Sequence, residues 1–410
     1  MATTIILGAG MVGVSSALAL QALGDNVVLV DRKGIGRETS YGNAGAIQTE
    51  AVEPYAFPRD LARLARIALK RSDEVNWHLR AMPEHLRPLM QYWLNSGPDG
   101  HARASRHYHE IVAQADLHHE PLIAAAGAAD LIERRGYHVI FRSANGLDLA
   151  WRDAERLSAQ WGVASRRVDG AALAALEPGL KQPLPGAVHY FDVWTCRSPG
   201  DLTAAYGRLF QERGGSFVHG DANSLEQVGA GWRLRLSAGE VDAERVVVAL
   251  GAWSAQLAAK FGYRIPLFRK RGYHRHFNLT GGPTRPLYDA ERSTFLAPMN
   301  QGLRLCTGAE FTQLDARIDW RQIRRSEAAA RELFDFGDPI EAEPWFGHRP
   351  CLPDMLPVIG EAPRHRGLWF NFGHGHQGFT AGPASAQILT NAMVGNPLAV
   401  TGALEVGRFS

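Results

Sequence analysis

The amino-terminal end of the chain pairs apolar runs with a glycine-rich turn. Apolar residues 5–7 precede a turn over 8–13 and a segment of strong helix formers over 14–23, and a second strand-like segment, 26–31, is apolar at 27–30. Short, continuous apolar runs that flank a helix are typical of strands buried on both faces of a parallel sheet. The opening of the chain therefore predicts a βαβ unit.

The carboxyl end repeats this pattern. Apolar residues 368–372 lead into a glycine-rich turn at 373–378 and a helical segment from about 379 to 394. Between the two ends, the periodicity predicts mainly helices over 52–135, further helices at 147–161, 199–213 and 322–334, and strands at 136–142, 186–194, 216–219, 232–236, 245–250 and within 263–320. We therefore expect an α/β fold (α+β overall) in which discontinuous domains interleave along the chain.

Length and charge narrow the class of protein. The chain has 410 residues, and its 44 basic and 42 acidic residues give a formal net charge of +2. Domains usually span roughly 100–200 residues, so two packed domains are expected. The balanced charge argues against nucleic acid as the main partner, because binding a phosphate backbone usually requires a clustered basic excess.

The cysteines and histidines indicate neither a disulfide scaffold nor a metal site. Three widely spaced cysteines are typical of a reduced intracellular protein, and the 16 histidines lack a coherent set of carboxylate or cysteine partners. No apolar run approaches the roughly 20 residues of a membrane span, and no leader pattern precedes the first strand. We expect a cytoplasmic protein without a bound metal.

The first turn carries a phosphate-binding motif. Gly8, Gly10 and Gly13 form G-x-G-x-x-G between a strand and a helix, and Asp31 ends the second strand. Such glycines permit a tight turn, close approach of the backbone to a pyrophosphate and close packing of the helix, while the acid accepts hydrogen bonds from a ribose. The motif predicts dinucleotide binding, but it does not separate NAD from FAD.

Three further segments favour FAD. The small residues of 39–45 and the turn after strand 245–250, at Gly251, would let the backbone pass close to a long cofactor. The turn at 373–378 opens a helix, whose amides and dipole would face the negative charge of a reduced flavin. An NAD-dependent dehydrogenase remains the alternative, but it would leave this last turn unexplained.

These motifs together resemble the FAD-dependent D-amino-acid dehydrogenase family, within the wider group of glycine, sarcosine and D-amino-acid oxidases. The resemblance covers nearly the whole chain and rests on Gly8-x-Gly10-x-x-Gly13 with Asp31, Ser40-x-x-Asn43-Ala44-Gly45, Val248-Ala249-x-Gly251-Ala252, Gly347-His348-Arg349-Pro350 with Pro353-Asp354 and Pro357-Val358-Ile359-Gly360, and Gly373-His374-Gly375 with Gly378-x-Thr380. Two segments, 270–274 and 297–304, are similar to a glyphosate oxidoreductase-like branch of this group.

The resemblance implies a noncovalent FAD and assigns residues to it. The implied cofactor-binding residues are Gly8, Gly10, Gly13, Asp31, Arg32, Ser40, Asn43, Ala44, Gly45, Ala222, Gly251, Gly373, Gly375, Gly378 and Thr380. The diphosphate and adenosine would lie at the first turn, and the flavin ring would lie at the last.

The resemblance also implies a substrate site. Arg349 matches the arginine that binds the substrate carboxylate, and a structural pair with Asp354 is the alternative. His348 departs from the small or apolar residue usual before that arginine, which leaves the size and polarity of the substrate open. Tyr273 and His274 either line the pocket or are exposed strand residues.

Two histidines of the last turn are the candidate catalytic residues. His374 and His376 could relay a proton near neutral pH, or they could only shape the loop, because hydride transfer from a neutral amine needs no protein base.

We accordingly expect a Rossmann-like FAD-binding domain built from residues 1–50, 195–262 and 345–410. A substrate domain with a mixed sheet and cap helices would come from 51–194 and 263–344. The expected reaction is FAD-dependent oxidation of a CH–NH₂ or CH–NH donor, foremost a D-amino acid converted to a 2-oxo acid. Oxidation of a secondary amine, such as D-proline, hydroxyproline or an N-carboxymethyl amine of the glycine, sarcosine or glyphosate type, is the alternative. A non-catalytic flavin-binding subunit is a further alternative to an enzyme.

The electron acceptor is expected to be a quinone or oxygen. The basic amphipathic stretch 59–71 could lie peripherally on the inner face of the cell membrane, or it could be a solvated cap helix.

Overall fold

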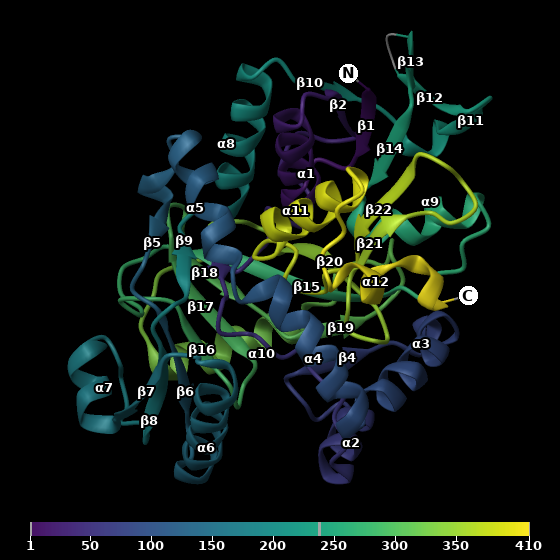
Figure 1. The fold of residues 1–410 in the computed structure, drawn as a ribbon. Coiled ribbons are helices and arrows are strands. Elements are labelled where there is room, and N and C mark those ends of the chain that lie inside the picture. Colours follow the sequence, from purple (N-terminus) through teal and green to yellow (C-terminus); the bar gives the residue numbers. More distant parts are fainter. Residues whose placement is uncertain (1, 237–238, 410) are drawn as a thin grey trace.

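The computed structural model describes residues 2–236 and 239–409. Within them, a six-stranded sheet forms one half of the molecule (Figure 1). Its strands, in spatial order, are β10 (Ser216–His219), β2 (Asn26–Asp31), β1 (Thr3–Leu7), β14 (Arg245–Val248), β22 (Leu368–Phe372) and β21 (Val358–Glu361). All neighbours are parallel except β21 and β22. The strands predicted at the two ends of the chain, β1 and β22, therefore lie on either side of β14.

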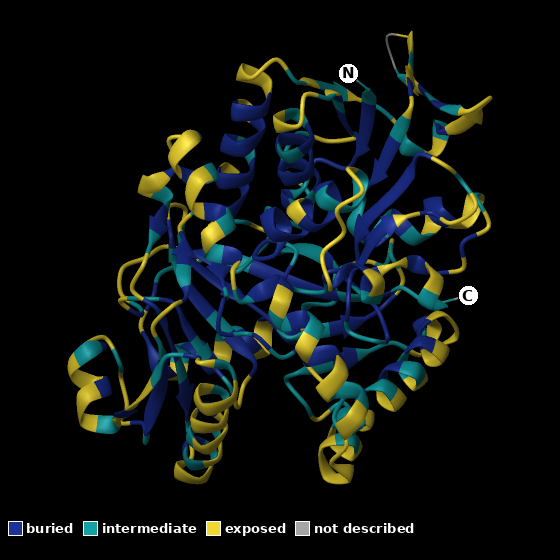
Figure 2. Cartoon of the chain, viewed as in Figure 1, coloured by how far each residue is buried: buried dark blue, intermediate teal, exposed yellow. Residues whose placement is uncertain are grey.

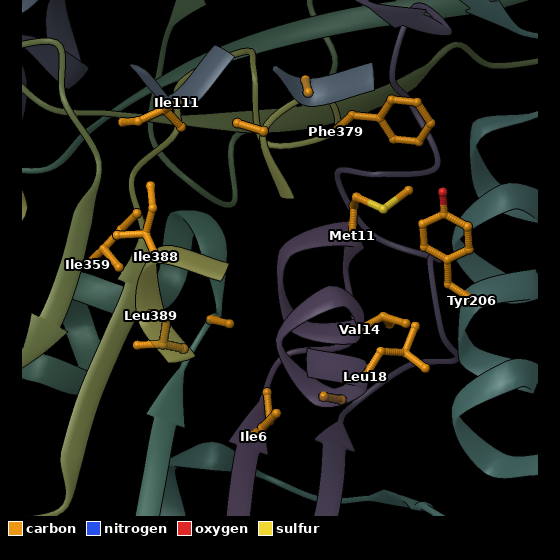
Figure 3. Close-up of a cluster of buried hydrophobic side chains, with 14 of the residues drawn as sticks. Ile6, Met11, Val14, Leu18, Ile111, Tyr206, Ile359, Phe379, Ile388 and Leu389 are labelled. Atoms are coloured by element: carbon orange, nitrogen blue, oxygen red, sulfur yellow. The ribbon is translucent and has the colours of Figure 1, made fainter. Parts of the chain in front are cut away.

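Both faces of this sheet are buried, which explains the continuous apolar runs. On β1, Ile6 faces one apolar cluster, whereas Ile5 and Leu7 face another. The first face is covered by α1 (Met11–Ala22), α8 (Pro199–Glu212) and α11 (Gly382–Met393), and Figure 3 shows Val14 and Leu18 of α1 directed toward the helix of Tyr206. The other face is covered by β12 (Gly231–Leu236), β13 (Gly239–Ala243) and α9 (Ser254–Lys260), and β11 (Glu226–Val228) pairs with the outer side of β12.

A ten-stranded mixed sheet forms the other half. Its strands are β4 (Val75–Trp77), β19 (Ala309–Phe311), β15 (Phe268–Phe277), β18 (Gly302–Cys306), β17 (Thr294–Met299), β16 (Leu287–Asp289), β6 (Tyr137–Phe141), β8 (Gly186–Tyr190) and β7 (Ser165–Asp169), with β20 (Trp345–Cys351) paired to β15. The helix α10 (Trp320–Leu333) packs on this sheet through Ile323, Ala330 and Leu333.

Smaller elements connect and cover the two sheets. They are β3 (Ala46–Ile47), β5 (Ile132–Glu133), β9 (Trp194–Cys196), α2 (Leu61–Ala68), α3 (Met82–Asn95), α4 (Pro98–Val112), α5 (Ala115–Ala125), α6 (Ala144–Trp161), α7 (Gly170–Leu176), α12 (Thr401–Leu404), and the 3-10 turns η1 (Leu79–Ala81), η2 (Ala129–Leu131), η3 (Ala222–Ser224), η4 (Gly251–Trp253) and η5 (Val406–Phe409). Figure 2 shows that α2, α6 and α7 are largely exposed, whereas the central strands of the six-stranded sheet are buried. Across the described residues, none of the helices combines the length and apolar content required to cross a bilayer.

The expected α/β class and the mixed second sheet are confirmed. The helix predicted to start at about 379 begins later, at Gly382, because residues 378–380 still belong to the turn. The proposed domain boundary at 345 falls just before β20, which pairs with β15 along its whole length in the ten-stranded sheet. The chain thus returns to the first half only after β20, and the division into domains stays a prediction.

Candidate active site

A cavity of about 640 Å³ lies between the two sheets. The six-stranded sheet contributes the carboxyl ends of its strands, including Gly8, Asp31 and Phe372, and the ten-stranded sheet contributes Lys270 and Arg349. A crevice at the carboxyl ends of parallel strands is where open α/β sheets bind ligands. The volume lies within the roughly 300–1,000 Å³ usual for cofactor and small-molecule sites.

The first glycine turn is packed so closely that side chains cannot be added. Gly8 has φ +107°, and an added Cβ would lie 2.4 Å from the carbonyl oxygen of Ala249. A Cβ at Gly13 would lie 1.8 Å from the carbonyl oxygen of Gly8, so Gly13 acts by packing α1 against the turn and does not line the cavity. Gly10 lines the cavity at the start of α1. The backbone therefore carries no side chains at the glycines where a pyrophosphate would approach.

The end of the cavity that is predicted to hold the adenosine is built around Asp31. Its carboxylate accepts hydrogen bonds from the backbone amides of Ala9 and Lys33, both at 2.8 Å. Burial raises the pKa of Asp31, and these amide bonds oppose that shift. The guanidinium of Arg32 lies 4.3 Å from the ring centroid of Trp253. Both residues line the cavity together with Asp31, Ala222 and Gly251.

The 40–45 segment acts partly through its own hydrogen bonds. The hydroxyl of Ser40 accepts the amide of Met11 at 2.9 Å and so holds the start of α1. The side-chain oxygen of Asn43 accepts the amide of Gly45 at 2.8 Å. Ser40, Asn43 and Ala44 line the cavity, but Gly45 does not, because its backbone passes against Cys196.

The carboxyl-terminal turn forms another wall of the cavity. Gly373, Gly375 and Gly378 line it, and the amide of Gly375 donates to the carbonyl of Pro350 at 2.8 Å, which fixes the turn beside β20. Thr380 lies outside the lining; its hydroxyl accepts the amide of Gln48 at 3.2 Å and thereby connects the turn to the segment after β3.

Both histidines of this turn face the cavity as neutral rings. Burial lowers the pKa of His374 to about 3. Burial, followed by the charges of Arg349 and Lys270, lowers the pKa of His376 to about 3. The ring of His376 packs against Tyr55, with 4.7 Å between centroids. Rings with such low pKa values are suited to hydrogen bonding, and they would store a proton only weakly.

Arg349 extends from β20 over the bare backbone of Gly272, where an added Cβ would lie 2.6 Å from Nη2. Its guanidinium donates to carbonyl oxygens of the 307–308 loop at 3.2 and 3.4 Å. Asp354, the alternative structural partner, pairs instead with Arg408 at 2.5 Å. Among the described residues, no carboxylate lies within ion-pair distance of Arg349, so its charge faces the cavity.

The three other predicted substrate residues are not placed as expected. The hydroxyl of Tyr273 donates to Glu310 at 2.7 Å on the opposite face of β15, so only the backbone of Tyr273 reaches the cavity. His274 is stacked on Trp345, with 4.8 Å between ring centroids, and does not line the cavity. His348 is also buried outside the lining, and burial lowers its pKa to about 4.

The acid that holds Tyr273 belongs to a polar cluster behind β15. His78 Nε2 lies 2.7 Å from Oε1 of Glu310 and 3.5 Å from Asp319. The other carboxylate oxygen of Glu310 accepts a hydrogen bond of 2.6 Å from Nε of Arg271. Because Arg271 shares the carboxylate of Glu310 with His78, these residues form a hydrogen-bonded ion-pair network. The hydrogen bond from Tyr273 to Glu310 joins Tyr273 to this network and explains why its side chain faces away from the cavity.

Several cavity residues were missed at the sequence level. Lys270, Tyr55 and Tyr92 line the cavity near Arg349. Side chains alternate along a strand, so Lys270 lies on the same face of β15 as Gly272. This alternation could have indicated that Lys270 faces the cavity. Tyr55 comes from an irregular segment and Tyr92 from α3, so neither carried a motif.

The residues present fit FAD. The cradle at Gly8 and Gly13 is one that a Cβ would fill, and the cavity continues from Asp31 and Ala222 to the second glycine turn. The ring nitrogen Nε2 of His374 is buried without a hydrogen-bond partner in the described protein. A long dinucleotide with polar groups at both ends suits such a cavity.

Comparison with known proteins agrees with this geometry. A family model described as FAD dependent oxidoreductase matches residues 3–392. The chain is 31% identical over 407 residues to a D-amino-acid oxidase of Bradyrhizobium diazoefficiens, covering 95% of this chain and 94% of the relative. It is 30% identical to a D-amino acid dehydrogenase of Chromohalobacter salexigens, covering 99% of each chain.

Solved structures of other proteins share the fold of this chain. The crystal structure of glycine oxidase from Geobacillus kaustophilus superposes with a TM-score of 0.72 and 19% identity, over 100% of this chain and 98% of that one. The family match spans both glycine turns and β20. It identifies the cofactor as FAD and so excludes the alternative of an NAD-dependent dehydrogenase. The chain therefore belongs to the FAD-dependent oxidoreductase family of D-amino-acid oxidases and dehydrogenases.

Proposed function

We propose that the protein oxidises the C–N bond of a small carboxylated amine, foremost a D-amino acid, with FAD as the electron acceptor. The observation that carries this proposal is the guanidinium of Arg349, which faces the cavity beside the second glycine turn without a protein carboxylate. The names of the relatives, D-amino-acid oxidase and dehydrogenase, support the substrate class. A secondary amine with a carboxymethyl group remains the second candidate.

Arg349 binds and orients the substrate. Its planar fork suits a carboxylate, and Gly272 and the 307–308 loop hold it in place, so little freedom is lost on binding. The amine end of a bound substrate then extends toward the turn that carries His376, because Gly375 of that turn is hydrogen-bonded to Pro350, next to Arg349.

Aromatic and apolar residues line the same end of the cavity. Tyr55 packs on His376 although it is 63% exposed, and Phe57, Leu64 and Ile67 line the adjoining wall. A bound substrate that displaces water from this wall would strengthen the ion pair between Arg349 and its carboxylate.

The chain favours a neutral amine at the reacting carbon. The positive charges of Arg349 and Lys270 disfavour an ammonium group nearby, just as they lower the pKa of His376. Bound FAD supplies the two-electron oxidation. Transfer of a hydride from the carbon to the bound FAD would leave an iminium ion, which water hydrolyses to a 2-oxo acid and ammonium, or a protonated amine if the substrate was secondary. The proton-relay roles of His374 and His376 stay a prediction.

An anaerobic substrate screen tests the proposal. Flavin bleaching would be followed with D-amino acids, their L-enantiomers, D-proline and N-carboxymethyl amines. We expect bleaching by at least one carboxylated amine and none by the same amine without its carboxylate. Absence of bleaching by any amine would instead favour a non-catalytic flavin-binding subunit.

Variants at Arg349 test the site itself. Arg349→Ala should lower kcat/KM for the best substrate by about 100-fold or more, since charge-assisted hydrogen bonds each contribute about 1.5–3 kcal/mol. Arg152→Ala, on the exposed face of α6, is the matched control and should keep the wild-type value. Equal kinetics for both variants would contradict the assignment of Arg349.

We further propose that α2 and α3 form a surface that touches an anionic membrane, from which a quinone could accept electrons. Leu61 and Leu69 are 81% and 63% exposed, and three apolar side chains of α3, those of Leu86, Met90 and Leu94, are 66%, 58% and 61% exposed. Arg66 of α2 and Arg71, which follows the helix, lie on either side of Leu69 in the sequence. Exposed apolar side chains beside basic ones are typical of interfacial helices.

Vesicle sedimentation tests this surface. The FAD-loaded protein should sediment with phosphatidylglycerol-containing vesicles more than with pure phosphatidylcholine, and Leu61→Glu should reduce that fraction. Leu149→Glu, at a leucine that is 56% exposed on α6, is the control. If the Leu61 variant sediments like the wild type, α2 is a solvated cap helix.

A further inference from the structure

Lys270 differs from its neighbours on β15 in having no acidic partner. Arg269 pairs with Glu84 at 2.8 Å, and Arg271 pairs with Glu310 at 2.6 Å. Lys270 lies between these two arginines and lines the cavity. Among the described residues, none of the carboxylates lies within ion-pair distance of its ammonium group.

Lys270 and Arg349 lie directly opposite each other. They are register partners of the antiparallel pair β15 and β20, and both line the cavity. Opposite positions on one face of a sheet place Cβ atoms about 4.5–5.5 Å apart, and like charges there destabilise the fold. The described structure therefore holds two positive charges without acidic partners on opposite strand positions of one cavity wall, an arrangement that an anionic ligand would relieve.

The two charged groups point in opposite directions along β15. The guanidinium of Arg349 lies over Gly272, on the carboxyl-terminal side of Lys270. The ammonium of Lys270 lies 4.7 Å from the ring centroid of Tyr92 and 5.6 Å from that of Phe268, on the amino-terminal side. They are therefore placed to bind two separate anionic groups, one at each end of a small molecule.

The acids that line this cavity, Asp31, Glu38, Glu74 and Asp221, are already engaged. Glu38 pairs with Arg32 at 2.7 Å, and Asp221 accepts the amide of Asn223 at 2.9 Å. Glu74 lies in the wall but is paired with Arg63 through two hydrogen bonds of 2.7 and 2.9 Å. Asp31 is held by backbone amides at the adenosine end. The aromatic rings around Lys270 offset part of its charge, but they do not neutralise it. The remaining neutralising charge has to come from the ligand.

We propose that the substrate is an amine with two carboxylates, one bound by Arg349 and the other by Lys270. This inference rests on the proposed amine oxidation and narrows its substrate class. An acidic D-amino acid and an N-carboxymethyl amino acid share this chemistry. A substrate with one carboxylate would leave Lys270 without a partner.

Matched pairs of substrates test the proposal. D-aspartate would be compared with D-asparagine, D-glutamate with D-glutamine, and iminodiacetate with sarcosine, on the FAD-loaded enzyme. We expect kcat/KM to be at least tenfold higher for the dicarboxylate in one of these pairs, and that pair identifies a primary or a secondary amine. Equal or higher values for the neutral member of every pair would overturn the proposal.

Variants assign the preference to Lys270. Lys270→Gln should bring the ratio within the preferred pair close to one, whereas Lys270→Arg should keep most of it. Lys181→Gln, at a lysine that pairs with Asp335 outside the cavity, should keep the wild-type ratio. If Lys270→Gln lowers both members of the pair equally, Lys270 does not bind the second carboxylate.

A binding measurement separates this inference from the proposed function. Calorimetry of the FAD-loaded protein with glutarate and with butyrate requires no turnover. We expect glutarate to bind at least tenfold more tightly to the wild type, with the difference lost in Lys270→Gln. This result would stand even if no amine bleached the flavin, and equal affinities would refute the paired site even if amines were oxidised.

Discussion

Replacing Gly272 by alanine should misplace Arg349 without removing any charge. An added Cβ would lie 2.6 Å from Nη2 and 2.8 Å from Cζ of the guanidinium, whereas ordinary contact begins at 3.4 Å. The guanidinium therefore has to retreat by about 0.8 Å. The backbone of Gly272 needs no left-handed conformation, so the alanine itself fits the strand.

The magnitude follows from the contacts that this shift disturbs. A hydrogen bond to a charged group contributes about 1.5–3 kcal/mol, and each 1.4 kcal/mol is tenfold in a binding or rate constant. Loss of one of the two bonds to a substrate carboxylate should thus lower kcat/KM by about 10- to 100-fold. KM should rise because the carboxylate is bound less tightly, and kcat should fall because the carbon is misaligned.

Steady-state kinetics on the best substrate, together with flavin absorbance and Tm, check this prediction. Flavin content should be unchanged, because Gly272 lies on the ten-stranded sheet and not in the phosphate cradle. Gly402→Ala is the control, since a Cβ there meets no atom within 4 Å. A Gly272→Ala enzyme within twofold of the wild-type kcat/KM would refute the role assigned to the guanidinium.

Three other predictions concern the cofactor and the fold. Gly13→Ala should abolish FAD binding, because its Cβ would lie 1.8 Å from the carbonyl oxygen of Gly8; flavin absorbance of the purified protein at wild-type level would contradict this. Burial raises the pKa of Glu50 from 4.5 to about 7, so the stability that comes from its protonated form is present below pH 4.5 and is lost as pH rises through 7. Relative to the wild type, Glu50→Gln should therefore gain about 3 kcal/mol in urea unfolding between pH 4.5 and pH 8, and a constant difference would count against this. Burial raises the pKa of Cys351 and of Cys306, both in the cavity wall, so they stay unreactive thiols; acid denaturation should release all FAD into the supernatant, and yellow precipitate would show a covalent bond instead.

Local chemistry explains why the cofactor end of the fold could be predicted. The strand, glycine turn and helix at residues 5–23 lie within one short segment, and the glycines are needed for contacts inside that segment, such as Gly13 against Gly8. Apolar runs with no polar alternation indicated strands buried on both faces, as Ile5 and Ile6 are. The amino-acid sequence alone thus determined the fold class, the family resemblance and the cradle, and it offered Arg349 as the candidate ligand of a substrate carboxylate.

Only the tertiary structure decided which side chains face the cavity. Tyr273 and Lys270 lie in the same short segment, yet Tyr273 turns to Glu310 behind the sheet and Lys270 faces the cavity opposite Arg349. The register of β15 against β20 sets this arrangement, and it joins residues far apart in the chain. A shift of one residue would exchange the two faces, because side chains alternate along a strand, and no local pattern specifies that pairing.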